Sequence, residues 1–332
     1  MSTERINWID WAKVLGIWLV VYGHTPGHIM GNIIFLFHVP LFFILSGILY
    51  KKRSFFAELK RSSYSLLLPY LVYNILISIL TDPNLLLNSQ HFFNILTGNQ
   101  EGLDNIFRPM WFVVAIFVIR VFISLFNKVW MGGAISVAVF LIMKYTGLIC
   151  YEHDYFQIGT SMLCTGFMVI GYYFINKPRW DIMSKININA LWKVSFLILS
   201  AVIFVIIGLL NRKYALDKTY GAINVFRCAT GYSVFLFAIV ALALSYIFIK
   251  LAELLFPHNN RFVEILSSGT LMILCVHQFV VTTVSNMFGY NSFSALILAT
   301  SVVAVSYCFI NLSKKYFPLL IGKKFNYNFF HS

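Results

Sequence analysis

The chain has 332 residues, of which 59% are hydrophobic and 11% are charged, and its formal net charge is +13 at pH 7. A soluble domain carries about 25% charged residues, so this composition excludes a soluble globular protein and predicts an integral membrane protein. The basic residues lie mostly in short connections between apolar segments, which indicates membrane topology rather than nucleic-acid binding. No small-residue cleavage site follows Arg5, so we expect no cleavable signal peptide.

Ten apolar segments follow one another along the chain, and we expect each to form a transmembrane helix. They lie at about residues 11–29, 32–50, 64–81, 109–126, 129–147, 158–176, 191–210, 229–250, 262–286 and 293–312. Short connections favour antiparallel neighbours. The sequence therefore predicts an all-α, polytopic membrane bundle of about ten helices, with residues 1–332 as a single domain. The longest external connection, 82–108, is a candidate substrate-contacting loop.

The basic residues predict the orientation, because lysine and arginine gather in cytoplasmic connections. If the N-terminus is cytoplasmic, the inner segments hold Arg5, Lys51, Lys52, Arg53, Lys60, Arg61, Lys128, Lys177, Arg179, Lys185, Lys250, Arg261, Lys314, Lys315, Lys323 and Lys324. The outer connections hold Arg108 and, before the eighth segment, Arg212, Lys213, Lys218 and Arg227. We therefore predict both termini in the cytoplasm, with the connection 211–228 as the one exception to the pattern.

The first apolar segment, DWAKVLGIWLVVYGH, carries Lys13 near its inner end and His24 near its outer end. At ~100° per residue, 11 residues turn a helix about 20° past three full turns, so both side chains lie on one face. They are separated by about 16 Å along the helix axis. Because ionisable groups are costly inside a membrane, this pair marks a pathway or a reaction site.

Two further histidines fall at the same depth. His38 lies near the outer end of the second segment, and His277 lies about 22 Å along the ninth. Arg108 and Trp111 begin the fourth segment at that level. Three histidines could bind zinc. We expect no metal, because no carboxylate lies nearby and Pro26 and Gly27 break the helix between His24 and His28.

Arg120 lies midway along the fourth segment, where a charge should face the bundle interior. It could pair with Asp10 or with a ligand of Lys13, and the sequence does not decide between them.

Two stretches together resemble a known family. IDWAKVLGIWLVVYGH, from Ile9 to His24, and FHVPLFFILSGILYKK, from Phe37 to Lys52, resemble the first two conserved blocks of acyltransferase family 3. Weaker similarities follow at LLLPYLVYN, MWFVVAIF, FMVIGYYF and SSGTLMILCVH. The members of this family are membrane O-acyltransferases that act on polysaccharides and other surface glycans.

The resemblance implies roles for individual residues. The family's first motif is an arginine, ten residues and a histidine, and Lys13 stands here at the arginine position before His24. Lysine keeps the charge but loses the planar fork of arginine. The family also has an arginine pair before the third helix, where this chain has Lys60 and Arg61 nearby but Ser65 at the expected place.

The implied reaction takes an acyl group, most simply acetyl, from cytosolic acyl-CoA to a hydroxyl of a cell-surface polysaccharide or lipid-linked sugar. Acetyl-CoA is then a co-substrate, and no cofactor is permanently bound. The implied catalytic residues are His24 and His277, with His24 as general base or, on the other route, as the carrier of a covalent acyl group. The donor-binding residues are Lys13, Lys60, Arg61 and Arg120, and the acceptor-binding residues are His38, Trp111, Arg108, Tyr22 and Asn74.

These implications place the protein in the inner or plasma membrane as a multi-pass enzyme in contact with lipid and without nucleic acid. A second copy of the chain, in a homo-oligomer, is a further expected partner. Two other hypotheses remain. One is a proton-coupled transporter of a glycan or small polar solute, with the histidines relaying protons. It lacks visible repeat halves and mid-membrane carboxylates. The other is a structural partner in a glycan-assembly complex.

Overall fold

The computed structural model describes residues 6–148, 154–174, 189–215, 223–258, 260–285 and 291–323. These residues are almost entirely helical. The described strands are β1 (Ile223–Asn224) and β2 (Ala229–Thr230), which pair antiparallel. The all-α prediction is confirmed at this level. Six residues used above to predict the orientation lie outside the described residues: Arg5, Lys177, Arg179, Lys185, Lys218 and Lys324.

Each of the ten predicted segments contains a helix. The α-helices are α1 (Asn7–His24), α2 (Gly31–Ile34), α3 (His38–Ile48), α4 (Phe55–Ser62), α5 (Leu68–Thr81), α6 (Ser89–Thr97), α7 (Trp111–Ser124), α8 (Val129–Tyr145), α9 (Ile158–Phe174), α11 (Ala190–Lys213), α12 (Val234–Leu255), α13 (Arg261–Ser268), α14 (Thr270–Ser285) and α15 (Ser292–Tyr316). A π-helical turn, Ser63–Leu67, joins α4 to α5. Short 3₁₀ helices lie at Pro83–Leu87, Gln100–Gly102, Arg108–Met110, Tyr155–Gln157, Val225–Arg227 and Pro318–Ile321.

Five helical stretches of the described chain are long and apolar enough to cross a membrane. They are Gly31–Ile48, Phe55–Thr81, Ala190–Lys213, Val234–Leu255 and Ser292–Tyr316. A sixth is added if α13 and α14 form one bent span. The chain is therefore a multi-pass membrane protein. The count of ten spans and the cytoplasmic position of both termini stay predictions.

The second predicted segment is not one continuous helix. It divides into α2 and α3, and α3 begins at His38. Pro40 then lies in the first turn of α3, where its missing N–H has no intrahelical partner to lose. The proline therefore explains why a new helix begins at His38, and that start carries the histidine into the centre of the bundle.

The ninth predicted segment also differs from the prediction. It bends by 76° between α13 and α14. Gly269 lies at the break, where an added Cβ would be 2.4 Å from Cγ1 of Ile310. His277 consequently lies seven residues into α14, about 10 Å from the start of that helix rather than about 22 Å along a straight one.

Close backbone packing fixes α3 against α9. A Cβ added to Gly47 would lie 1.9 Å from the carbonyl oxygen of Met168, and one added to Gly171 would lie 2.1 Å from that of Ile44. Small residues let membrane helices approach this closely and gain van der Waals contact. The contact holds α3 in position along its length.

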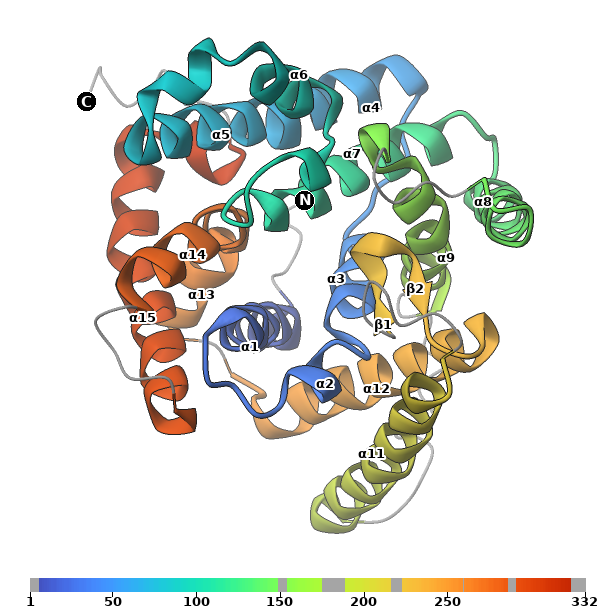
Figure 1. The fold of residues 1–332 in the computed structure, drawn as a ribbon. Helices are drawn as coiled ribbons and strands as arrows, with labels where there is room; N and C mark the ends of the chain where they lie inside the picture. Colours follow the sequence, from blue (N-terminus) through green and yellow to red (C-terminus); the bar gives the residue numbers. More distant parts are fainter. Residues whose placement is uncertain are drawn as a thin grey trace.

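The helix α1 lies inside the bundle. In Figure 1 it is seen almost end-on, between α3 on one side and α13, α14 and α15 on the other, and it contacts all of them and α12. By contrast, α11 extends from the edge of the molecule with most of its apolar side chains exposed, as suits a lipid-facing helix. The residues of α1 are thus positioned to line an internal site.

Candidate active site

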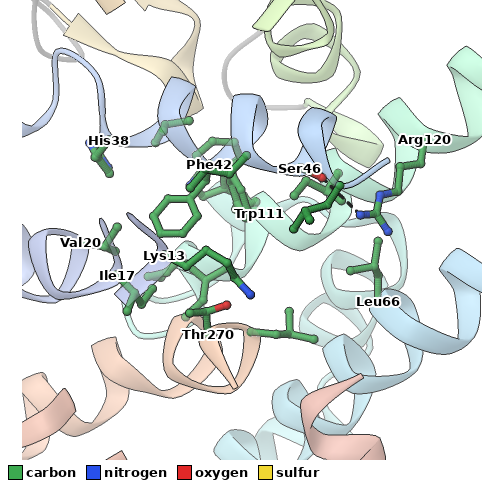
Figure 2. A pocket seen from close by; sticks show the side chains of 18 of the residues that line it. Lys13, Ile17, Val20, His38, Phe42, Ser46, Leu66, Trp111, Arg120 and Thr270 are labelled. Carbon is green, nitrogen blue, oxygen red and sulfur yellow. Dashed lines mark hydrogen bonds between the residues drawn. The ribbon is translucent and has the colours of Figure 1, made fainter. Parts of the chain in front are cut away.

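Two neighbouring cavities meet beside α1. The first, which we call the lysine cavity, has a volume of about 230 Å³. Its polar side chains are Lys13, His24, His38, Ser46, Arg120 and Thr270, and Trp111 also borders it. Its walls are otherwise apolar, formed by Ile17, Val20, Val39, Phe42, Leu45, Leu49, Leu66, Pro109, Phe112, Ile116, Leu271 and Leu274. It is a mostly apolar space in which Lys13 and Arg120 lie apart from His38 (Figure 2).

The second, which we call the arginine cavity, is larger and more polar, with a volume of about 470 Å³. It is lined by His24, Asn32, Phe35, His38, Val39, Asn105, Arg108, Pro109, Trp111, Arg212, Ile223, Asn224, Val225, Arg227 and Gln278. The two cavities share His24, His38, Val39, Pro109 and Trp111. The histidines of α1 and α3 therefore lie where a mostly apolar space adjoins a polar one.

The three histidines predicted at one depth are brought together. The rings of His24 and His277 have their centroids 5.1 Å apart and lie nearly perpendicular. The Phe35 ring lies beside both His24 and His38, with its centroid 6.1 Å from that of His24 and 5.2 Å from that of His38. The group comes from α1, α3 and α14, whose separate starts and bends set the positions of the rings.

Each histidine is oriented by a backbone carbonyl three or four residues before it, within the same helix for His24 and His277 and at the end of α2 for His38. The Nδ1 atoms lie 2.8 Å from the Val20 carbonyl oxygen in His24, 2.9 Å from that of Ile34 in His38 and 2.8 Å from that of Leu274 in His277. A carbonyl only accepts hydrogen bonds, so Nδ1 carries the proton in each ring. When the ring is neutral, Nε2 is then the proton acceptor.

His277 differs from the other two in its surroundings. Its side chain is fully buried, and its Nε2 has no hydrogen-bond partner among the described residues. His277 does not line either cavity described above, and it contacts the ring of His24 from behind. His24 and His38 therefore line both cavities, whereas His277 packs against His24 outside them.

The opposite end of the lysine cavity holds two cations. Lys13 Nζ donates a 2.6 Å hydrogen bond to the carbonyl oxygen of Ser267, at the end of α13. Ser267 Oγ in turn donates to the Asp10 carboxylate. A cation at a helix C-terminus is favourable, so the break before Gly269 supplies the partner of Lys13.

Arg120 forms the second cationic position. Its guanidinium donates to Ser46 Oγ at 3.3 Å, across the gap between α7 and α3, and its Nε has no partner among the described residues. Figure 2 shows Arg120 and Ser46 on one side of the cavity and Lys13 with Thr270 on another. Of the two partners considered for Arg120 from the sequence, Asp10 is thus replaced by Ser46, while Asp10 bonds to Ser267.

Other predicted donor-binding residues lie apart from the cavities. Lys60 and Arg61 are exposed on α4 and line neither cavity. On the same helix Glu58 is fully buried, accepting from Ser62 at 2.7 Å and pairing with Arg53 at 3.3 Å.

Two predicted acceptor-binding residues also lie outside the cavity walls. Tyr22 is buried and stacks on Trp18 at 5.5 Å between ring centroids. Asn74 is buried in α5, where its Nδ2 donates to the Tyr70 carbonyl at 2.8 Å. His38, Trp111 and Arg108 do line the arginine cavity.

The sequence did not single out several polar residues of the arginine cavity. They are Asn32, Asn105, Arg212, Asn224, Arg227 and Gln278. One signal could have found two of them: Arg212 and Arg227 belong to the connection that departs from the expected distribution of positive charge. Positive charges that oppose the predicted membrane orientation indicate that these side chains have a role at the site itself.

Comparison with known protein families gives a match along most of the chain. The model of the acyltransferase 3 family, described as an acyltransferase domain, matches residues 6–312, nearly the whole chain. The match includes every residue of both cavities. No curated protein and no solved structure matches the chain.

Proposed function

This chain belongs to the acyltransferase 3 family, and on that premise we propose that it is a membrane O-acetyltransferase. It moves an acetyl group from cytosolic acetyl-CoA to a hydroxyl of a cell-surface polysaccharide or lipid-linked sugar. One observation carries the proposal: His24 lies where a mostly apolar cavity with cations at its far end adjoins a polar cavity. Two substrates that approach from opposite sides can meet only at such a junction.

The donor occupies the lysine cavity. Its phosphates are attracted by Lys13 and Arg120, since both side chains offer charge-assisted hydrogen bonds to oxyanions. The thin chain that joins these phosphates to the thioester passes between apolar walls toward His24. Lys13 and His24 are about 16 Å apart along α1, which gives an extended chain room to place its thioester beside the imidazole.

His24 acts as the general base. Its Nε2 accepts the proton of the acceptor hydroxyl while the hydroxyl oxygen attacks the acyl carbon. The tetrahedral intermediate then collapses, the carbon–sulfur bond breaks, and the proton on Nε2 passes to the departing thiolate. The products are an ester and free CoA, and the imidazole returns to its starting tautomer.

The neighbouring histidine holds this base in place. His277 lies against the His24 ring at 5.1 Å between centroids, and the Val20 carbonyl fixes Nδ1 of His24 at 2.8 Å. A base held by its own helix and a packed neighbour needs little reorganisation at the moment of proton transfer. Trp111 and His38, which line both cavities, border the space where the acyl group and the acceptor meet.

The same proposal sets the membrane arrangement. Ten membrane helices with both termini in the cytoplasm place Lys13 toward the cytosol and His24 toward the outside. The acetyl group therefore crosses most of the membrane on its carrier, and the acceptor reaches the arginine cavity from outside. We place the protein in the inner or plasma membrane.

Mass spectrometry of surface glycans from cells with and without the protein tests the proposal. We expect an acetyl increment of the glycan mass only when the protein is present. Identical glycan masses in both cells would contradict it. Vesicles reconstituted with the protein separate this function from transport: export of a sugar without any acyl transfer would favour the proton-coupled transporter.

A further inference from the structure

The arginine cavity carries more positive charge than a neutral sugar needs. Arg108, Arg212 and Arg227 all line it, and they come from three separate parts of the chain. Glu101 pairs with two of them: it accepts two hydrogen bonds from Arg227, at 2.5 and 3.1 Å, and lies 3.6 Å from Arg108. Among the described residues, two of the three arginines therefore share one glutamate.

Arg212 is the arginine of this cavity that does not pair with Glu101. No carboxylate of the described chain lies within ion-pair distance of its guanidinium, which is only partly exposed and lines the cavity. The adjacent Asn211 is held firmly: its Nδ2 donates to the Thr230 carbonyl at 2.9 Å, and its Oδ1 accepts from the Ser233 amide at 2.8 Å. The end of α11 is thus fixed to the start of α12, and Arg212 is fixed beside the cavity.

Arg108 also offers an unused donor. Its Nε is buried and has no hydrogen-bond partner among the described residues. A buried donor of a charged group without a partner costs free energy, which a ligand oxygen in the cavity recovers. The same cavity holds a buried Gln278 oxygen and three asparagines, which suit hydroxyl groups of a sugar.

We propose that the acceptor is anionic, and that Arg212 and Arg108 bind a carboxylate or phosphate on the sugar whose hydroxyl is acylated. This inference rests on the proposed function and names its acceptor class. Guanidinium groups match both oxyanions through paired hydrogen bonds. The proposal also explains why arginines are retained in a connection where positive charge opposes the predicted topology.

Three small acceptors that differ only at C6 of one sugar ring provide the test. They are methyl glucoside, which is neutral, methyl glucuronide, which carries a carboxylate, and methyl glucoside 6-phosphate. The full-length protein in lipid nanodiscs receives acetyl-CoA and each acceptor in turn, and mass spectrometry gives kcat/KM for the acetylated product. We expect at least one anionic acceptor to exceed the neutral one by about tenfold, the gain from one charged hydrogen bond. The anionic acceptor with the higher kcat/KM shows whether the site prefers a carboxylate or a phosphate.

The variant Arg212→Gln should reduce that ratio toward one, and Arg212→Lys should restore part of it. The matched control is Lys213→Gln, which removes the same charge from an exposed neighbour outside the cavity wall and should keep the ratio. Equal rates for neutral and anionic acceptors, or the same loss of preference in the Arg212→Gln and Lys213→Gln variants, would overturn the proposal.

A binding measurement without acetyl-CoA separates this inference from the proposed function. An anionic acceptor should raise the melting temperature of the nanodisc protein more than methyl glucoside does, and Arg212→Gln should remove the difference. If no acceptor is acetylated but this difference is present, the proposed reaction fails and the anion site stands. If no difference is present, the anion site fails.

Discussion

At the residue scale, the site depends on how each side chain is held rather than on residue type alone. The three histidines share one arrangement, in which Nδ1 donates to a backbone carbonyl three or four residues earlier in the chain. Only their positions separate them: His24 and His38 line both cavities, whereas His277 is fully buried against His24. Position therefore separates His277 from the two histidines that line the cavities, and the role of His24 as general base stays a proposal.

Lys13 provides a prediction at this scale. The Lys13→Ala variant removes a cation from the lysine cavity. If acetyl-CoA binds there, KM for acetyl-CoA should rise by about tenfold, with a smaller change in kcat. Lys13→Arg keeps the charge and adds a planar fork, so it should bind acetyl-CoA at least as well as the native protein. Steady-state kinetics over a range of acetyl-CoA concentrations measure both. An unchanged KM in the alanine variant would remove Lys13 from the donor site.

At the element scale, breaks in the helices place the site residues. The start of α3 at His38 and the bend of 76° before α14 turn side chains from two segments toward α1. Hydropathy predicts each of these segments as one helix, because a sliding window averages over the residues at a break. Pro40 and Gly269 are the local signals, and their effect depends on packing against other helices.

The close contact of α3 with α9 gives a second prediction. Gly47→Ala would place a methyl group where the Met168 carbonyl oxygen lies, so the two helices must separate. We expect a loss of about 1–3 kcal/mol in the free energy of unfolding, and lower activity, because α3 carries His38 and Ser46. Gly159→Ala on α9 is the control, since its nearest neighbours would be 3.5 Å away. Chemical denaturation in detergent measures both, and equal stability of the two variants would contradict the packing argument.

His91, in the connection between α5 and α7, gives a prediction about pH. Burial lowers its pKa below the ordinary 6.5, and the Asp104 carboxylate partly opposes this shift. In the folded protein the ring resists a proton that the unfolded chain accepts, so stability is full above pH 6.5 and falls as the pH drops below that value. Ser78 Oγ donates its proton to the Asn74 carbonyl, so it accepts a hydrogen bond from His91 Nε2 at 3.0 Å. A glutamine side chain can replace the imidazole as that donor.

The His91→Gln variant should therefore lose less stability between pH 7.5 and pH 5.5 than the native protein. Hydrogen exchange of the α6 amides at the two pH values measures the local effect. The exposed His258, changed to glutamine, serves as the control and should leave the native pH dependence unchanged. A native pH dependence in the His91→Gln variant would show that this ring does not contribute.

At the scale of the whole molecule, the sequence predicts the helical membrane class and the order of its apolar segments well. It also predicts a common depth for His24, His38 and His277 from segment direction and length, but the bend before α14, which helps bring the rings together, is not predicted. It does not predict the arginine cavity. That cavity is assembled from α1, α2, α3, α7, α11, α14 and two connections far apart in the chain, and only folding brings Arg108, Arg212 and Arg227 to one cavity.

The departures from the predicted site have a common physical reason. Lys60, Arg61, Tyr22 and Asn74 were assigned by nearness in sequence to a motif or by residue type. Which way a helix turns its side chains depends on packing against neighbours, and this packing exposes Lys60 and Arg61 and buries Tyr22 and Asn74 away from the cavities. Their assigned roles stay predictions.

The most direct test of the account is acetyl transfer by the His24→Ala variant in nanodiscs, supplied with acetyl-CoA and an acceptor that the native protein acetylates. We predict a fall in kcat of about 100-fold or more, as expected for a lost general base, with the melting temperature kept near that of the native protein. The exposed His258→Ala variant is the matched control and should retain native activity. Native kcat in a folded His24→Ala variant would contradict the account.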